Sequence, residues 1–229
     1  MPANQQNNKR SSWLPYVLLA IIAGIGGAAL SLSNRQPPTP PVLATATLLT
    51  PGKTIKPAGL VDYDGKAFGL EQLQGFYTFV FFGYTHCPDI CPATLYQFKT
   101  IAKTLKSQQP ELYARTRFML VSIDPQRDTP RHLKEYVQYY DPTFIGITGS
   151  LGDIKTFSRQ MGVIFERREN EDETEKNQDN EDYLVDHSSA ILMLNPEGHL
   201  KAVFSAPHNA TEIMKDYQSI FNYLEKNKS

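Results

Sequence analysis

Apolar residues follow two alternating periods in the C-terminal two thirds of the chain. Phe76–Phe82 is a continuous apolar run, typical of a strand that is covered on both faces, and Arg117–Ile123 and Phe144–Ile147 are interpreted as further strands. Between them, apolar positions recur at helical spacing in Pro92–Lys106 and Pro130–Tyr140. Strands that alternate with helices in this way predict parallel βαβ units.

The pattern changes towards the C-terminus. A third helix over Leu151–Met161 is followed by a short strand at Val163–Glu166. Ser189–Leu194 and Leu200–Phe204 then flank the turn sequence Asn-Pro-Glu-Gly, which predicts an antiparallel hairpin. A last helix opens at Asn209, with a glutamate three residues later as in a capping box. Parallel units followed by a hairpin and a helix predict an α/β protein with a thioredoxin-like fold.

Two further segments precede these units. Apolar positions within Lys53–Leu73 flank the turn pair Asp64-Gly65, which predicts a hairpin that extends the fold at its N-terminal side. Residues 34–47 include the run Gln-Pro-Pro-Thr-Pro-Pro, which is typical of a stiff, extended linker. We therefore assign residues 48–229 to the thioredoxin-like domain.

The N-terminal region contains one long uncharged segment. No charged residue occurs from Ser11 to Asn34, so residues 13–33 are predicted to form one transmembrane helix that anchors the chain. Lys9 and Arg10 place residues 1–12 in the cytoplasm and the remainder on the periplasmic side of a bacterial inner membrane. The small residues at the end of the segment leave a cleaved signal peptide as the alternative. Either way, the domain lies in a compartment where a disulfide can persist.

Charge and composition exclude some classes of function. The chain has 229 residues and a formal net charge of −1, a balance that does not indicate nucleic-acid binding. Residues 166–182 form an acidic insert with nine acidic and three basic side chains. We interpret this insert as a solvated loop or hairpin tip, with a docking patch for a basic partner protein as the alternative.

The only two cysteines, Cys87 and Cys91, lie together at a strand-to-helix junction. Such junctions lie at the carboxyl edge of an open α/β sheet, where ligands collect. The pair can form a disulfide or hold a soft metal ion, and the residues alone leave both open. Because a proline fits the first helical position, we expect the helix to begin at Pro92 with Cys91 as N-cap. The helix dipole would then lower the pKa of Cys91.

Two thiols do not complete a metal site, so a third ligand is needed. Of the five histidines, His187 stands just before the C-terminal hairpin, in a loop expected near the cysteines, and is the candidate. Its position alone does not decide between a ligand and a bystander. The others are interpreted as bystanders or, for the neighbour of Cys87, as pointing to the opposite face; they are His86, His132, His199 and His208.

Two aspartates follow the second parallel strand. Asp124 should point into the same crevice as the cysteines, to orient a ligand or contact a partner, or else it caps the turn around Pro125. Asp128 or Thr129 is expected to cap the helix that Pro130 opens, a structural role.

Three stretches of the sequence resemble the Sco/SenC family of membrane-anchored, thioredoxin-like copper proteins. They are Phe-Gly-Tyr-Thr-His-Cys-Pro-Asp-Ile-Cys-Pro at 82–92, Val-Ser-Ile-Asp-Pro-Gln-Arg-Asp-Thr-Pro at 121–130, and Val-Asp-His-Ser-Ser at 185–189 followed by Asn-Pro-Glu-Gly at 195–198. The resemblance implies that Cys87, Cys91 and His187 bind one copper ion, Cu(I) or Cu(II), per monomer. It also implies that the two cysteines cycle between dithiol and disulfide.

The family resemblance implies a copper metallochaperone that delivers copper to the Cu(A) site of cytochrome c oxidase. The recipient would be the Cu(A)-bearing subunit or another copper protein, and the chain would act as a monomer. The alternatives are a thiol–disulfide oxidoreductase that reduces the cysteines of that subunit, or a redox or copper sensor. Enzyme activity, if any, would be confined to the redox-active pair Cys87 and Cys91.

Overall fold

A computed structural model describes residues 13–33, 39–168 and 184–227, and the chain divides into two compact units, Met1–Thr39 and Pro40–Ser229. In the first unit, α1 spans Leu14–Ser33. Among the residues that the structure describes, no helix has both the length and the apolar character that crossing a membrane requires. The anchor predicted over residues 13–33 is therefore not confirmed and stays a prediction.

The second unit is built on one large mixed sheet. Its strands are β1 (Ala46–Thr54), β2 (Leu60–Asp62), β3 (Ala67–Phe68), β4 (Tyr77–Gly83), β5 (Thr116–Ser122), β6 (Ile145–Gly149), β9 (Ile191–Leu194) and β10 (His199–Phe204). They lie in the order β1-β10-β9-β4-β5-β6-β2-β3, and β4, β5 and β6 are mutually parallel. The predicted parallel units and the C-terminal hairpin are thus confirmed.

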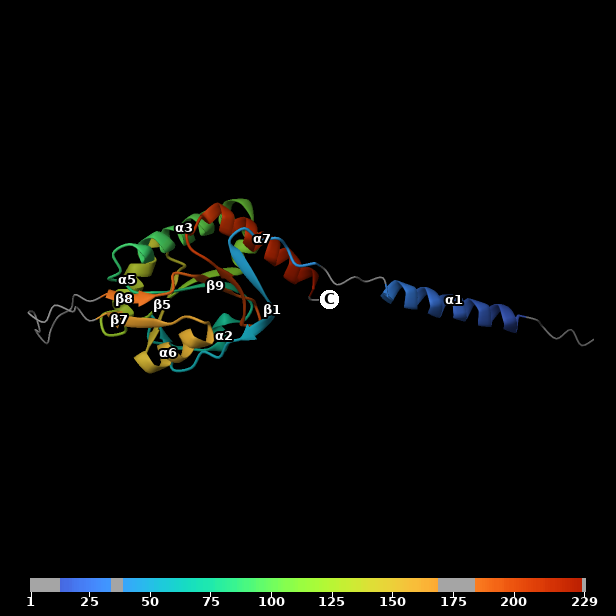
Figure 1. The fold of residues 1–229 in the computed structure, drawn as a ribbon, viewed down its shortest axis with the longest axis horizontal. Helices are drawn as coiled ribbons and strands as arrows, with labels where there is room; N and C mark the ends of the chain where they lie inside the picture. Colours follow the sequence, from blue (N-terminus) through green and yellow to red (C-terminus); the bar gives the residue numbers. More distant parts are fainter. Residues whose placement is uncertain (1–12, 34–38, 169–183, 228–229) are drawn as a thin grey trace, which may run out of the picture. The chain divides into compact units, whose positions relative to one another are not determined.

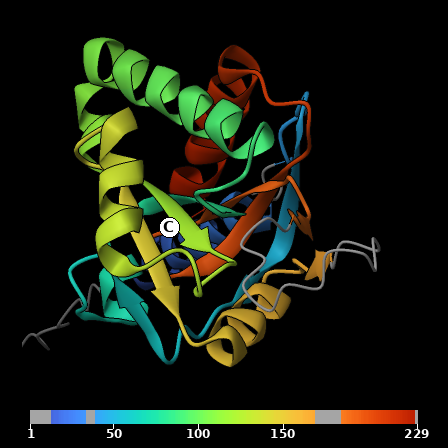
Figure 2. The same ribbon diagram turned by 90° about the vertical axis from the view of Figure 1, so that its left-hand side faces the viewer.

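Helices cover both faces of this sheet (Figures 1 and 2). On one face α3 (Ile90–Gln108) lies beside α5 (Pro130–Tyr140) and α7 (Ala210–Lys226), and the short α4 (Pro110–Ala114) links α3 to β5. On the other face lie α6 (Leu151–Gln160) and the single turn α2 (Leu70–Leu73). This arrangement of layers and strands is the thioredoxin-like α/β architecture that the sequence predicts.

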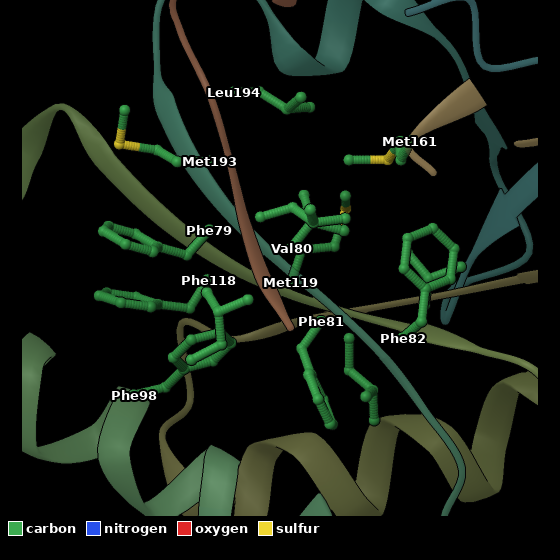
Figure 3. Packing of buried hydrophobic residues seen from close by; sticks show 14 of the residues in the cluster. Phe79, Val80, Phe81, Phe82, Phe98, Phe118, Met119, Met161, Met193 and Leu194 are labelled. Atoms are coloured by element: carbon green, nitrogen blue, oxygen red, sulfur yellow. The ribbon is translucent and has the colours of Figure 1, made fainter. Parts of the chain in front are cut away.

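Residues of β4 alternate between these two helical layers. Phe79 stacks on Phe118 of β5, with ring centroids 5.4 Å apart, on the face that α3 covers. Phe82 points the other way and contacts Phe157 of α6 at 5.8 Å (Figure 3). Every residue of β4 is buried, which is why this strand reads as a continuous apolar run rather than an alternating one.

The N-terminal edge of the sheet contains a strand that the sequence pattern did not indicate. β1 pairs antiparallel with β10, and the segment that leads into it is held by the carboxylate of Asp216 in α7. The backbone N–H groups of Ala44, Thr45 and Ala46 donate to this carboxylate at 2.7–2.9 Å. Burial raises the pKa of Asp216, but the hydrogen bonds outweigh it, and the net shift is downward.

Local signals in the sequence are confirmed at several element ends. β2 and β3 form the predicted hairpin, and Gly65 in its turn has a φ of +75°. Asn209 caps α7 by accepting from the N–H groups of Thr211 and Glu212. The short strand expected at 163–166 is β7 (Phe165–Arg168), which pairs with β8 (Leu184–His187) in a separate two-stranded sheet. The acidic insert, apart from its first three residues, lies outside the described residues.

Replacing Asp216 with asparagine should lower the free energy of unfolding at neutral pH by about 2 kcal/mol, because hydrogen bonds to a buried carboxylate are lost. The folded-state pKa lies below the unfolded value, so the carboxylate stabilises the fold above about pH 4 and that contribution is lost as the pH falls through the folded pKa. Urea titration at neutral and acidic pH measures both effects. Glu212→Gln on the exposed side of α7 is the control, and a difference between the two variants that does not shrink in acid would contradict the assignment.

Candidate metal centre

The two cysteines lie where β4 ends and α3 begins. The structure places α3 at Ile90 with Asp89 as N-cap, so Cys91 is the second helical residue and Pro92 the third. The predicted start at Pro92 was therefore two residues too late. A proline at the third position loses no helical hydrogen bond, because the first one runs from the N–H of Ala93 to the carbonyl of Asp89. In a longer helix the ring of Pro92 would clash with the carbonyl of Pro88, but Pro88 lies outside α3.

Cys87 and Cys91 are both reduced, with no disulfide between them, and both are buried. A hydrogen bond with Cys87 and burial raise the pKa of the Cys91 thiol far above its ordinary value. The sequence-based expectation of a lowered pKa is therefore wrong for the metal-free dithiol. The neighbouring sulfur stabilises the protonated form of Cys91, and this outweighs the backbone hydrogen bond at Tyr84 that favours the thiolate. The structure does confirm that the two sulfurs come together.

Gly83, the last residue of β4, makes room for the buried sulfur. A Cβ at this position would lie 2.8 Å from Sγ of Cys91 and 3.1 Å from Cδ1 of Leu120, so any side chain would displace the thiol. The sequence carried a signal for this, since a glycine at the end of a buried strand often marks a close approach. Gly83 pairs with Ser122 of β5, which brings the ends of both strands to the same edge of the sheet.

Tyr84 connects the cysteine loop, which we define as residues 84–89 between β4 and α3, to β8. Its hydroxyl accepts a hydrogen bond from the backbone N–H of Val185 at 3.3 Å, and burial raises its pKa. His187 lies in the same strand, two residues beyond Val185, and pairs with Phe165 of β7. The strand that carries the third candidate residue is thus hydrogen-bonded to the cysteine loop through Tyr84. The imidazole of His187 falls outside the described side chains.

A hydrogen bond from a histidine holds the segment after β8. Nε2 of His208 lies 2.6 Å from the carbonyl oxygen of Ser189, and burial lowers the pKa of this imidazole. Burial favours the neutral ring and outweighs the hydrogen bond to Ser189, so Nε2–H donates to that carbonyl in a structural role. His199 lies at the start of β10, where its backbone N–H donates to Asn195.

Asp124 is buried in the loop after β5 and forms a 2.5 Å ion pair with Arg127. The guanidinium of Arg127 also lies 5.7 Å from the ring of Tyr84. A small pocket of about 90 Å³ lies between this loop and the β7–β8 ribbon, with Phe165 and Val185 in its wall. Asp124 lines this pocket, but neither Cys87 nor Cys91 is among the lining residues, so the prediction that Asp124 points into the crevice of the cysteines is not confirmed and stays a prediction.

Asp128 is the polar residue whose role sequence reasoning missed. Thr129 rather than Asp128 caps α5, by accepting from the N–H of His132. The Asp128 carboxylate is buried and accepts from the hydroxyls of Thr85 and Ser122 at 2.5 and 2.6 Å. It thereby ties the cysteine loop to β5, and burial raises its pKa. A capping aspartate and a buried one look alike in sequence, so no pattern could have separated them.

Comparison with known proteins agrees with this description. The family model described as SCO1/SenC matches residues 49–222. The chain is 31% identical over 202 residues to an SCO2-like protein of Rickettsia felis, covering 87% of this chain and 92% of that protein. Among solved structures, copper-bound ScoI of Arabidopsis thaliana is 31% identical with a TM-score of 0.64, covering 75% of this chain and 99% of that one. Copper-bound yeast Sco1 is 28% identical with a TM-score of 0.63, covering 72% and 86%.

These proteins share a thioredoxin-like fold, and their sequence likeness extends over most of the present chain. The chain belongs to the SCO1/SenC family.

The burial of Cys91 predicts unequal reactivity of the two thiols. In the reduced, metal-free protein at neutral pH, iodoacetamide should modify Cys87 before Cys91, because Cys91 is fully buried and its raised pKa keeps it protonated. Mass spectrometry of digested samples taken over time measures both rates. Equal rates in the folded protein would contradict the described geometry, and the same assay in denaturant supplies the control.

Removing the Tyr84 hydroxyl should loosen β8. In Tyr84→Phe the buried N–H of Val185 loses its partner, at a cost of about 1–2 kcal/mol. Hydrogen exchange should show the Val185 amide exchanging about tenfold faster, since 1.4 kcal/mol corresponds to a factor of ten. Tyr139→Phe on the exposed side of α5 is the matched control and should leave this amide unchanged.

Proposed function

We propose that this protein is a copper metallochaperone that carries one copper ion as cargo, bound by Cys87, Cys91 and His187. The observation that carries the proposal is the pair of reduced thiols, hydrogen-bonded to each other at the carboxyl edge of the sheet. The copper-bound relatives from Arabidopsis and yeast support the choice of metal.

The residues fit the chemistry of a copper ion. Thiolates are soft ligands that suit Cu(I), and two of them in contact can share one ion once they lose their protons. The metal would take the place of the proton that now lies between the sulfurs. Burial that disfavours a bare thiolate at Cys91 then favours the metal-bound form, because the cation neutralises the sulfur charge. Binding is coupled to proton release and should strengthen as the pH rises.

His187 is proposed as the third ligand. Its backbone lies in β8, which Tyr84 ties to the cysteine loop, and this tie is the structural support for the assignment. Two sulfurs and one nitrogen leave an open side on the ion. A recipient's thiolates or imidazoles can enter there and take the copper by ligand exchange.

The Cu(A)-bearing subunit of a cytochrome c oxidase is the proposed recipient, on the basis of the family resemblance. The uncharged segment at residues 13–33 is the proposed membrane anchor, with the domain in the periplasm. A proline-rich linker at 34–47 would hold the domain near a membrane-bound partner and raise its effective concentration.

Copper titration tests the ligand set. The reduced full-length protein should bind one Cu(I) per chain, and Cys87→Ser or Cys91→Ser should weaken binding by about a hundredfold or more, because a hydroxyl is a poor ligand for a soft ion. His187→Ala should also weaken binding, and His199→Ala is the matched control. Competition with a chromophoric Cu(I) chelator measures each affinity. Unchanged binding in all three ligand variants would refute the site.

A thiol–disulfide oxidoreductase is the second candidate function. It is favoured by the reduced, adjacent cysteines at the end of β4, the place where a thioredoxin-like fold supports thiol exchange. In that reaction one thiolate attacks the partner's disulfide, and the second cysteine then resolves the mixed disulfide, which leaves the chain oxidised and the partner reduced.

The two functions differ in their need for His187. If thiol exchange is the activity, His187→Ala should still reduce a disulfide-bonded peptide of the Cu(A) subunit at the wild-type rate, whereas Cys87→Ser should not. Quantifying free thiols in the peptide provides the measurement. No reduction by the wild-type dithiol would exclude this candidate.

A further inference from the structure

We propose a second metal site, formed by His86, Asp128 and His132, which binds a divalent transition-metal ion and prefers Cu(II). It lies beside the thiol pair but uses none of the three residues assigned to the copper cargo. The three side chains come from separate segments: the cysteine loop, the loop after β5, and the first turn of α5. Within the described part of the chain, they are the one group of three or more His, Cys, Asp or Glu side chains whose ligand atoms come near enough to one another to hold a metal ion.

The geometry of the cluster is close to that of a ligand set. Each residue offers one ligand atom, and these atoms all lie within 4.8 Å of one another. Nδ1 of His86 lies 4.0 Å from Oδ1 of Asp128, and the rings of His86 and His132 are 5.5 Å apart at an angle of 79°. Metal–nitrogen bonds of about 2.0–2.1 Å require ligand atoms slightly nearer than this. The His86 side chain is 46% exposed, so it can rotate the short remaining distance.

Asp128 is fixed in advance for this role. Its side chain is fully buried, and the hydroxyls of Thr85 and Ser122 hold the two carboxylate oxygens in place. An ionised carboxylate has about four acceptor positions. Each oxygen accepts one short hydroxyl contact and one long contact, at 3.2–3.3 Å, from the N–H that Thr85 shares between them, so a cation at Oδ1 would replace one of the two long contacts. Partners of this kind around a metal ligand set its orientation.

The donor set selects a different ion from the thiol site. Two imidazoles and a carboxylate are borderline and hard ligands, which suit divalent metals, and Cu(II) binds most tightly to such sites among the first-row ions. Thiolates favour Cu(I) instead. The partly exposed His86 leaves open coordination positions for water on the solvent side.

The second site does not depend on the redox state of the cysteines. None of its donors is a sulfur, so the protein should hold Cu(II) even when Cys87 and Cys91 form a disulfide. His86 immediately precedes Cys87, so the same loop carries a ligand of each proposed site. This arrangement would let one loop bind copper in either thiol state.

The test uses the full-length chain with the cargo site removed by Cys87→Ser, Cys91→Ser and His187→Ala. This background should bind one Cu(II) per chain, with electron paramagnetic resonance showing nitrogen hyperfine splitting from imidazole. Adding His86→Gln or His132→Ala should weaken binding by about tenfold or more, a loss seen even when only the partners of a metal ligand are removed. His199→Ala in the same background is the control and should change nothing.

Two results would overturn the proposal: no Cu(II) bound by the background, or binding unchanged when His86→Gln and His132→Ala are combined. Both histidines have solvent-accessible side chains, so these variants should fold, and circular dichroism checks this. Because Cys87, Cys91 and His187 are absent throughout, a negative result leaves the Cu(I) cargo site standing. The Cu(I) titration of the cargo-site variants leaves His86, Asp128 and His132 unchanged, so a failure of the cargo site can be told apart from a failure of the second site.

Discussion

The parallel pairing of β4 with β5 is the constraint on which the rest of the site depends. Gly83 lies opposite Ser122 at the carboxyl ends of the two strands, so the loops that follow them start side by side. One loop and the start of α3 that follows it carry both cysteines and His86, and the other loop carries Asp124 and Asp128. A slip of one residue in this register would turn Gly83 away from α3 and fill the space of the Cys91 sulfur with a side chain.

The cysteine loop is held by polar contacts rather than by apolar packing alone. Asp128 ties Thr85 to Ser122, and Tyr84 ties the loop to the backbone of β8. Buried hydrogen bonds of this kind are costly to leave unmade, so they keep the loop in one arrangement. That arrangement brings two thiols into hydrogen-bonding contact without a disulfide between them, as the proposed copper site requires.

The chemistry at this edge of the sheet changes over a short distance. The thiol pair offers soft donors in a buried setting, while the cluster of His86, Asp128 and His132 offers nitrogen and oxygen donors nearer to solvent. The proposed copper chaperone and the proposed second site thus differ in oxidation-state preference for a physical reason. Both rest on the same two loops, so the fold supplies them together.

The amino-acid sequence by itself determined the fold and the thiol pair. Unbroken apolar strands and helical stripes predicted the central parallel units, because burial on two faces leaves no polar positions in a strand such as β4. The helix cap at Asn209 and the turn at Gly65 depend on contacts within a few residues, so the sequence also predicted them. The sequence did not predict strand β1, because its position depends on hydrogen bonds to Asp216, 170 residues away in the chain.

Only the tertiary structure decided how the site is built. The sequence indicated neither the raised pKa of Cys91, which arises from its contact with Cys87 and its burial, nor the start of α3 at Ile90. It also gave no sign that His86, expected to point away from Cys87, and His132, interpreted as a bystander, would meet at Asp128. Those contacts join residues from different strands and loops. A periodic pattern along the chain indicates whether a side chain is buried, but it does not indicate which distant residue that side chain contacts.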